Sequence, residues 1–299
     1  MNKNNSRALF FIVALLWGSS FAVQKPILEV IDPVVFTFWN FFISGCAFFV
    51  YALIKKIPLT FRLREGIYLG LLLSGLEILQ TIGLKETSSA NTVFLSNIGM
   101  LMIPYIGYLL YGHKVGKANT FAIIIAGIGM YLLTGGLSVF GIGEGVLLLS
   151  AIFCGAYFFF SERFEAEKDS KLIALCVHQF FTISFVCLIW GFFVGSSFSI
   201  ARNVQLELLW QIVLFTTIPY TLIQVASKYA DEMVAAIYDG VIEPLTGAFV
   251  SWVVFLEVTT FSRVVGGMIM IFSFIFSALF SKRHFILHWA KNLRVEKSK

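Results

Sequence analysis

The chain has 299 residues, of which 58% are hydrophobic and only 13% are charged, with a formal net charge of +5. Soluble domains carry about a quarter charged residues, so this chain cannot face water over most of its surface. A single soluble domain is therefore excluded. The basic residues form no helical stripe but lie in short gaps and in the tail, so the positive charge predicts membrane anchoring rather than nucleic-acid binding.

Apolar runs separated by short polar gaps predict an all-α, polytopic membrane protein with ten transmembrane helices, because about 20 apolar residues are needed to cross a bilayer. The runs cover residues 8–24, 33–54, 66–84, 89–111, 118–136, 144–161, 172–195, 206–228, 233–255 and 261–281. The first run follows basic residues as in a signal peptide, but no small-x-small cleavage site follows it. We therefore expect it to be a retained first helix.

The basic residues also predict the orientation of the chain. With the N-terminus inside, all but four of the 22 Lys and Arg residues fall on the inner side, and the four are Lys25, Lys85, Arg202 and Arg263. Because Lys and Arg accumulate on the cytoplasmic side of membranes, both termini are predicted to be cytoplasmic. The predicted location is the bacterial cytoplasmic (inner) membrane.

The two halves of the chain echo each other. Three residues of the first run recur at the same spacing in the sixth, with Ala14, Gly18 and Phe21 corresponding to Ala151, Gly155 and Phe158. Corresponding runs are an odd number of spans apart, so the second half is predicted to be inverted relative to the first. This plan is typical of secondary transporters, which bind substrate between the repeats. We assign residues 6–139 to the first repeat, 142–281 to the second and 282–299 to a basic tail.

Several short motifs occur along the chain: Trp17-Gly18-Ser19-Ser20-Phe21, residues 84–91, Gly143-Glu144-Gly145, Ala235-Ala236, Glu243-Pro244, Leu256-Glu257 and Gly266-Gly267. These motifs resemble those of the EamA family of the drug/metabolite transporter superfamily. Residues 84–91 are similar to the family's L-x-x-T-S-A-A-N motif at the start of the fourth helix. Two positions depart from the family pattern: His113 replaces a Glu, and Leu256 replaces a Gly. Both end helices, so we expect them to affect folding or packing rather than chemistry.

The resemblance covers nearly the whole chain and implies ten helices in two inverted five-helix repeats that transport a small metabolite. It leaves the substrate open, because the family handles amino acids, their derivatives, nucleotide-like compounds and vitamins. The expected partners are this small molecule, with or without coupled protons, and the lipid bilayer. We expect no cofactor, no metal and no nucleic acid, and a monomer or a homodimer.

Three carboxylic acids inside the predicted spans are the main candidates for a functional site: Glu77, Asp239 and Glu243. A charge at the bilayer centre costs at least about 2.5–3.5 kcal/mol, so such groups face the bundle interior. Glu77, followed one turn later by Gln80, is predicted to carry a proton or to bind a cationic group, or else to be protonated and hydrogen-bonded to another helix. Asp239 and Glu243 share a helical face and will not both ionise readily, which suits proton exchange. Glu243 could equally support the adjacent proline.

Polar and aromatic residues on other runs complete the predicted site. The eighth run carries a polar stripe that lines either a cavity or a helix contact, because lipid cannot face it. Its residues are Thr217, Thr221, Gln224 and Lys228. Trp17 lies well inside the first run, whereas interfacial Trp residues lie nearer helix ends. Weaker candidates for the same pocket are Tyr157, Tyr220 and Tyr238, and His178-Gln179 is interpreted as a packing pair.

Two prolines inside predicted helices indicate kinks. Pro104 and Pro244 cannot donate to the carbonyls four residues earlier, those of Met100 and Gly240. Such carbonyls are tolerated at membrane depth only when they are buried or line a cavity. We predict Pro104, Gly240 and Pro244 to act as hinges, with a static kink as the alternative.

An intramembrane enzyme and a non-transporting membrane protein are the competing functions. No HExxH motif occurs, and no Gly-rich phosphate loop with a Lys occurs. Asp231-Glu232, at a predicted helix end, is the only adjacent acidic pair. No catalytic residues are therefore predicted, and the expected function is secondary transport of a small metabolite by alternating access.

Overall fold

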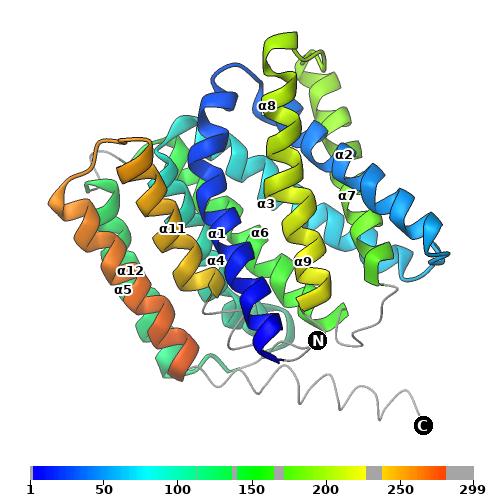
Figure 1. Ribbon diagram of the computed structural model, residues 1–299. Coiled ribbons are helices and arrows are strands. Elements are labelled where there is room, and N and C mark those ends of the chain that lie inside the picture. Colours follow the sequence, from blue (N-terminus) through cyan, green and yellow to red (C-terminus); the bar gives the residue numbers. More distant parts are fainter. Residues whose placement is uncertain (1–2, 113, 137–139, 165–171, 227–237, 281–299) are drawn as a thin grey trace, which may run out of the picture.

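The structure is a computed structural model that describes residues 3–112, 114–136, 140–164, 172–226 and 238–280, and its secondary structure within these ranges is helical. Figure 1 shows the bundle. Its elements are α1 (Lys3–Leu28), α2 (Pro33–Ile54), α3 (Leu63–Glu86), α4 (Ser89–Tyr111), α5 (Lys117–Thr134), α6 (Ile142–Phe164), α7 (Ile173–Val194), α8 (Arg202–Ile212), η2 (Val213–Thr217), α9 (Ile218–Ala226), η3 (Tyr238–Ile242), α11 (Glu243–Phe249), η4 (Val250–Val254) and α12 (Phe261–Phe280).

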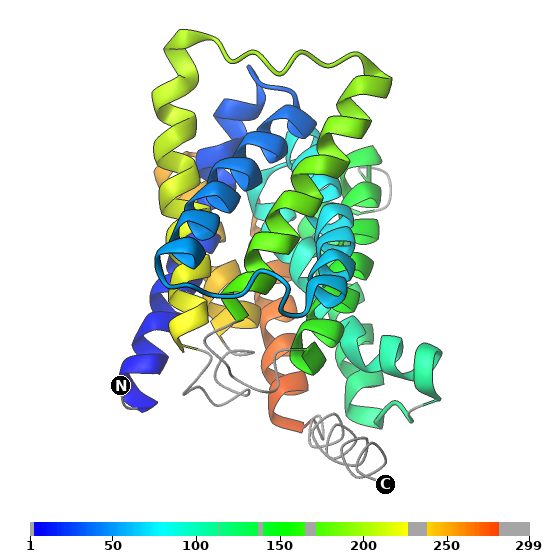
Figure 2. The same ribbon diagram turned by 90° about the vertical axis from the view of Figure 1, so that its right-hand side faces the viewer.

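Nine helices of the described residues are long and apolar enough to cross a membrane. One of them, the α8–α9 helix, runs without interruption from Arg202 to Ala226. A further helical segment, which we call the α11 helix, comprises η3, α11 and η4. The first residues of the ninth predicted span lie outside the described part of the chain. The all-helical, multi-span prediction is therefore confirmed. The N-terminal end of α1 and the C-terminal end of α12 lie at the same end of the bundle, as an even number of crossings requires (Figure 2).

Local sequence sets several of the helix ends. The carboxylate of Asp32 caps α2 by accepting from the backbone N–H groups of Val34 (2.9 Å) and Val35 (3.2 Å). The hydroxyl of Ser88 caps α4 in the same way, through the N–H of Asn91. Gly112 follows α4 with φ +71°, a conformation that suits a residue without a side chain. The polar residues between the apolar runs therefore lie at the ends of the helices and cap them.

The helix neighbours follow the two-repeat organisation. α2 packs on α7, and α5 packs on α12, so two helices of the first repeat each meet their own counterpart five spans later. In addition α6 packs on α3 and α4, and α1 correspondingly packs on the α8–α9 and α11 helices. Each of these contacts is therefore matched by the contact between the two corresponding helices when the repeats are exchanged. Such an exchange is what a two-fold relation between inverted repeats produces.

Glycines allow the paired helices to approach closely. A Cβ atom on Gly266 of α12 would lie 2.6 Å from the carbonyl oxygen of Gly129 in α5. In the reverse direction, a Cβ on Gly129 would lie 2.8 Å from the Gly266 carbonyl oxygen. Small residues at such crossings give membrane helices their van der Waals packing. Gly266 of the family-like motif therefore has a packing role here.

Leu256 occupies a backbone conformation that disfavours side chains. Its φ is +53°, and its side chain is 78% exposed. A left-handed backbone costs about 1–2 kcal/mol for a residue with a Cβ, and Gly avoids this cost. Gly also has more conformational entropy in the unfolded state, which offsets part of the gain in stability. Leu256→Gly should therefore stabilise the protein by up to about 1 kcal/mol. The measurement is thermal unfolding in detergent micelles. Leu256→Ala is the control, because it shortens the same side chain but keeps the Cβ. A Gly variant no more stable than the Ala variant would contradict the argument.

Candidate functional site

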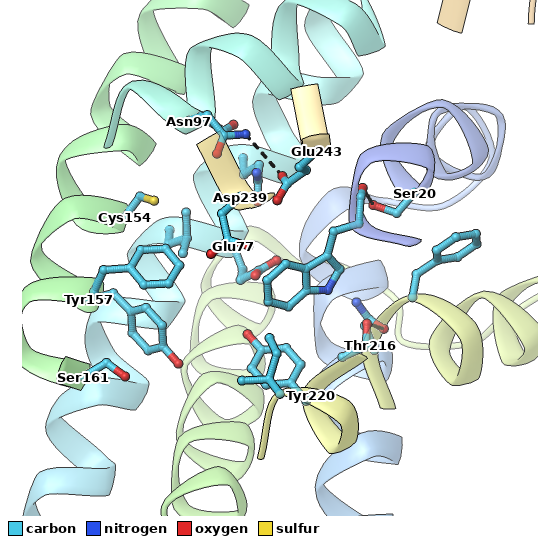
Figure 3. Close-up of a pocket in the computed structure, with 18 of the residues that line it drawn as sticks. Ser20, Glu77, Asn97, Cys154, Tyr157, Ser161, Thr216, Tyr220, Asp239 and Glu243 are labelled. Carbon is cyan, nitrogen blue, oxygen red and sulfur yellow. Dashed lines mark hydrogen bonds between the residues drawn. The ribbon is translucent and has the colours of Figure 1, made fainter. Parts of the chain in front are cut away.

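A cavity of about 320 Å³ lies inside the bundle, lined from both repeats. Its lining along α1 extends from Phe10 to Gln24, about 20 Å at 1.5 Å per residue. Side chains of α2, α3 and α4 contribute from the first repeat, and those of α6, α7, α8–α9 and α11 from the second. The volume is in the range of small-molecule sites. Figure 3 shows its central part.

Carboxylates from the two repeats face this cavity. Glu77 projects from α3, and Asp239 and Glu243 project from the α11 helix (Figure 3). Asp239 and Glu243 are 9% and 8% exposed, so water can reach them only through the cavity. The side-chain amide of Asn97 in α4 donates to Oε1 of Glu243 (3.2 Å) and also to the carbonyl oxygen of Val93 (2.9 Å). This amide therefore fixes Glu243 of the second repeat against a helix of the first.

Two π-helical turns border the cavity. The turn η2 ends two residues before Pro219, and η3 ends two residues before Pro244. A proline has no N–H, so the regular i→i−4 hydrogen-bond ladder cannot continue there, and a π turn is one way to satisfy the freed carbonyls. The first turn carries Thr216 and the second carries Asp239, both of which line the cavity. Such turns are frequent at functional sites.

Aromatic side chains from both repeats also line the cavity. The ring of Trp17 meets that of Tyr220 edge to face, with centroids 5.6 Å apart. Tyr220 in turn packs edge to face on Phe180 at 4.8 Å. The hydroxyl of Tyr157 donates to Oε1 of Gln179 (2.9 Å). Trp17, Tyr157 and Tyr220 are thus held in fixed orientations around the cavity.

Most of the residues predicted as a site come together here. The cavity is lined by Trp17, Glu77, Gln80, Tyr157, Gln224, Asp239 and Glu243, and by Tyr220. Tyr238 lies outside it, with its ring against that of Phe11 at 5.9 Å.

Thr221 also lies outside the cavity, because the helix turns a neighbouring face to it. The side chain of Thr221 is exposed and donates to the carbonyl of Thr217 (2.7 Å). The side of this helix that lines the cavity carries Thr216, Tyr220 and Gln224 at four-residue spacing. Thr217 and Thr221 each follow a lining residue by one position, about 100° around the helix, and Thr217 shares a hydrogen bond with Ser44 (2.9 Å). Lys228, the last member of the expected stripe, lies outside the described residues.

The predicted hinge residues lie at two different places. Gly240 lies within η3, and Pro244 follows it in the first turn of α11. A Cβ on Gly240 would meet Phe274 at 3.4 Å, so the position is packed without being crowded. Pro104 lies inside α4, away from the π turns. A hinge at the α11 helix would move Asp239 and Glu243 relative to each other.

Sequence reasoning missed several polar residues of the cavity. Asn40 and Asn97 each interrupt an apolar run, and Oδ1 of Asn40 accepts from the hydroxyl of Thr216 (2.7 Å). A single amide in an apolar run could have indicated a cavity residue, and Pro219 could have indicated the π turn before it. Gln179 also lines the cavity, so it does more than pack beside His178, whose Nε2 lies 2.7 Å from the Leu59 carbonyl oxygen.

The segment that resembles the family motif at residues 84–91 holds the α3–α4 junction together. Lys25 of α1 donates to the carbonyl oxygen of Leu84 (2.9 Å) and to that of Thr87. The carboxylate of Glu257 accepts from the backbone N–H groups of Ser89 (3.1 Å) and Ala90 (3.4 Å), where it also complements the positive end of α4. We call these contacts the junction latch.

A carboxylate of the second repeat supports the same junction. Glu144, in the first turn of α6, accepts from the side-chain amide of Asn91 (3.1 Å) and from the hydroxyl of Thr87. Its other oxygen accepts from the backbone N–H of Gly141 (3.0 Å). The motif residues therefore join the two repeats at the end of the bundle opposite the N-terminal end of α1.

The comparisons with known proteins agree with this architecture. The EamA-like transporter family matches residues 6–135 and 141–279. The chain belongs to this family. The two matched segments are the two repeats, and the nine long apolar helices of the described residues agree with a multi-pass membrane protein.

One protein that is similar in sequence and one solved structure illustrate the likeness. The chain is 29% identical over 198 residues to an uncharacterized transporter of Archaeoglobus fulgidus; the match covers 66% of this chain and 61% of that protein. The chain thus spans less than two thirds of that relative's length. A crystal structure of a further protein superimposes with a TM-score of 0.66 at 15% identity, covering 95% of this chain and 100% of the other. At that identity the likeness shows the fold alone.

Proposed function

We propose that the chain is a secondary transporter that moves a small metabolite across the cytoplasmic membrane by alternating access. The observation that supports this best is the cavity between the repeats, across which Asn97 of the first repeat is hydrogen-bonded to Glu243 of the second. Rocking of one repeat against the other would expose such a cavity to each side in turn. The candidate substrates are an amino acid, an amino-acid derivative, and a heterocyclic vitamin or nucleotide-like compound.

The same contacts suggest which parts move. The junction latch joins α1, through Lys25, and the segment after η4, through Glu257, to the ends of α3 and α4. Opening the bundle at that end requires these contacts to separate. The π turn before Pro244 is the proposed hinge, because its backbone has already left the regular ladder. Glu77, Asp239 and Glu243 are the proposed carriers if transport is coupled to protons.

The test is flux through the purified chain in liposomes. A thermal-shift screen of metabolites selects ligands, and counterflow of the best labelled hit is then measured. We expect saturable flux that excess unlabelled compound competes away, because a single binding site per transporter limits the rate. Protein-free liposomes are the control. If no compound of any charge class crosses faster than through these liposomes, the proposed function is wrong.

A further inference from the structure

Three helices that line the cavity do so only with the halves that lie away from the junction latch. Among the described residues, α4 lines it from Ser96 onward, the α8–α9 helix from Phe215 onward, and the α11 helix only up to Glu243. Nearer the latch, η4 packs on α1 and α4, and α8 packs on α1 and α2. On this side of the bundle the cavity is therefore closed toward the latch.

Gln211 of α8 is buried in this closed region. Its side chain is 0% exposed, and neither its Oε1 nor its Nε2 has a hydrogen-bond partner among the described residues. Phe215, four residues later on the same helix, lines the cavity. Residues four apart share one face of a helix, so Gln211 lies on the cavity side, one turn nearer the latch end.

Two serines next to the latch are buried in the same way. The hydroxyls of Ser89 in α4 and Ser251 in η4 have no partner among the described residues, and both residues are 0% exposed. Glu257 joins them, because its carboxylate accepts from the backbone N–H of Ser89 (3.1 Å) and its own N–H donates to the carbonyl oxygen of Ser251 (2.9 Å). Both unpartnered hydroxyls therefore lie on residues that the latch holds directly.

A regular seam between α4 and the α11 helix connects these serines to the cavity. Asn97 donates to Glu243 at the cavity, and one turn further a Cβ on Gly247 would lie 2.8 Å from Cγ1 of Val93. Each step is four residues, taken in opposite directions along the two helices, so the next step reaches the two serines. The seam thus runs from a pair of cavity residues to the latch.

Buried polar groups without partners are rare in folded proteins, and each of them calls for an explanation. Lipid cannot supply the missing hydrogen bonds, so polar groups at membrane depth have to be paired or reached by water. A chain that transports by alternating access has a second state, in which the latch separates. In that state water and the substrate reach Gln211 and the two serines and supply the hydrogen bonds that are missing here.

We infer that Gln211, Ser89 and Ser251 line the latch-side half of the substrate path, which is closed in this structure and opens when the junction latch separates. The inference rests on the proposed transport function and names residues that the substrate meets between the cavity and the latch. Their amide and hydroxyl groups are neutral and both donate and accept hydrogen bonds. They can therefore replace part of the water shell of a passing solute without holding it by charge.

The experiment measures how fast introduced cysteines react with MTSET, a methanethiosulfonate reagent that does not enter lipid. Gln211→Cys and Ser251→Cys are prepared in the full chain in nanodiscs, where the reagent has access to both membrane faces. Site-resolved mass spectrometry separates the introduced cysteine from the native ones. Ser150→Cys is the matched control, since Ser150 of α6 is also 0% exposed but its hydroxyl donates to the carbonyl oxygen of Leu76 (2.8 Å).

Both path variants should react at least about tenfold faster than Ser150→Cys, because they meet water whenever the latch-open state, a minor state of about 0.1–10%, is populated. Glu257→Ala removes charge-assisted hydrogen bonds of the closed state, so it should raise the two rates a further tenfold or so, an effect of about 1.4 kcal/mol. Lys25→Met weakens the latch from α1 and should act in the same direction, which keeps the test decisive if Glu257→Ala does not fold. Ser150→Cys should keep its slow rate in both backgrounds.

The inference is overturned if, with the latch weakened, Gln211→Cys and Ser251→Cys react no faster than Ser150→Cys. A rise of the same size at all three positions also overturns it, because general loosening of the bundle would then explain the reaction. Liposome flux separates this failure from that of the proposed function. A chain that carries a compound while both cysteines stay unreactive uses another path, whereas the absence of any flux rejects transport itself.

Discussion

Each of the substitutions Glu77→Gln and Asp239→Asn is expected to lower transport at least about tenfold, because losing a hydrogen bond made by a charged group costs about 1.5–3 kcal/mol. Both carboxylates line the cavity, and Asp239 is only 9% exposed. The amides keep the size of the side chains but can neither release a proton nor neutralise a cation. The measurement is counterflow of the best ligand in liposomes at two pH values, so that loss of a proton carrier appears as loss of pH dependence.

The control for this prediction is Glu207→Gln, which makes the same chemical change on the exposed surface of α8. It should transport at the wild-type rate. Circular dichroism and size-exclusion chromatography establish that the variants are folded. Wild-type rates in both Glu77→Gln and Asp239→Asn, at both pH values, would remove these residues from the site while leaving the rest of the cavity unaffected.

Gly18→Ala is expected to have the largest structural effect of any single added methyl group near the cavity. A Cβ at Gly18 would lie 2.4 Å from the carbonyl oxygen of Glu243 and 2.9 Å from Cβ of Thr246. Both neighbours belong to the α11 helix, so relief requires the backbones of α1 and α11 to separate. Overpacking of this kind typically costs about 1–3 kcal/mol. The shift would also carry Glu243 away from Asn97, so transport should fall with stability.

Thermal unfolding and counterflow of Gly18→Ala test this prediction together. Gly127→Ala is the matched control, since Gly127 lies inside α5 and an added Cβ there would meet nothing within 4 Å. That variant should be at least as stable as wild type, because Ala favours helix over Gly. A Gly18→Ala protein that unfolds at the control's temperature and transports normally would show that the α1–α11 contact is looser than the structure has it.

Many residues of the candidate site could be predicted one at a time from the sequence. Glu77, Asp239 and Trp17 stood out because lipid penalises polar groups in apolar runs, and this penalty acts on each residue whatever its neighbours are. Asn40 and Asn97 carried the same signal but were overlooked. The pairing of Asn97 with Glu243, in contrast, depends on which helices touch, and no local pattern contains that information.

The register of the α8–α9 helix shows a second kind of limit. A regular 3.6-residue period places Thr217, Thr221 and Gln224 on one face, but of these three only Gln224 lines the cavity. The lining residues Thr216, Tyr220 and Gln224 keep the regular spacing, so the helix turns a neighbouring face to the cavity. The period gives the relative positions of side chains on a helix, but the packing of the bundle decides which face meets the cavity.

The sequence alone determined that this chain crosses a membrane many times in two related halves, because the cost of putting polar groups into lipid and the need for apolar runs of fixed length act locally along the chain. Only the tertiary structure decided that Glu77 and Asp239, far apart in sequence, share one cavity, and that residues 84–91 serve a junction between repeats. Those facts depend on how helices from the two halves cross, which close glycine contacts and interhelical hydrogen bonds set only once the bundle has assembled.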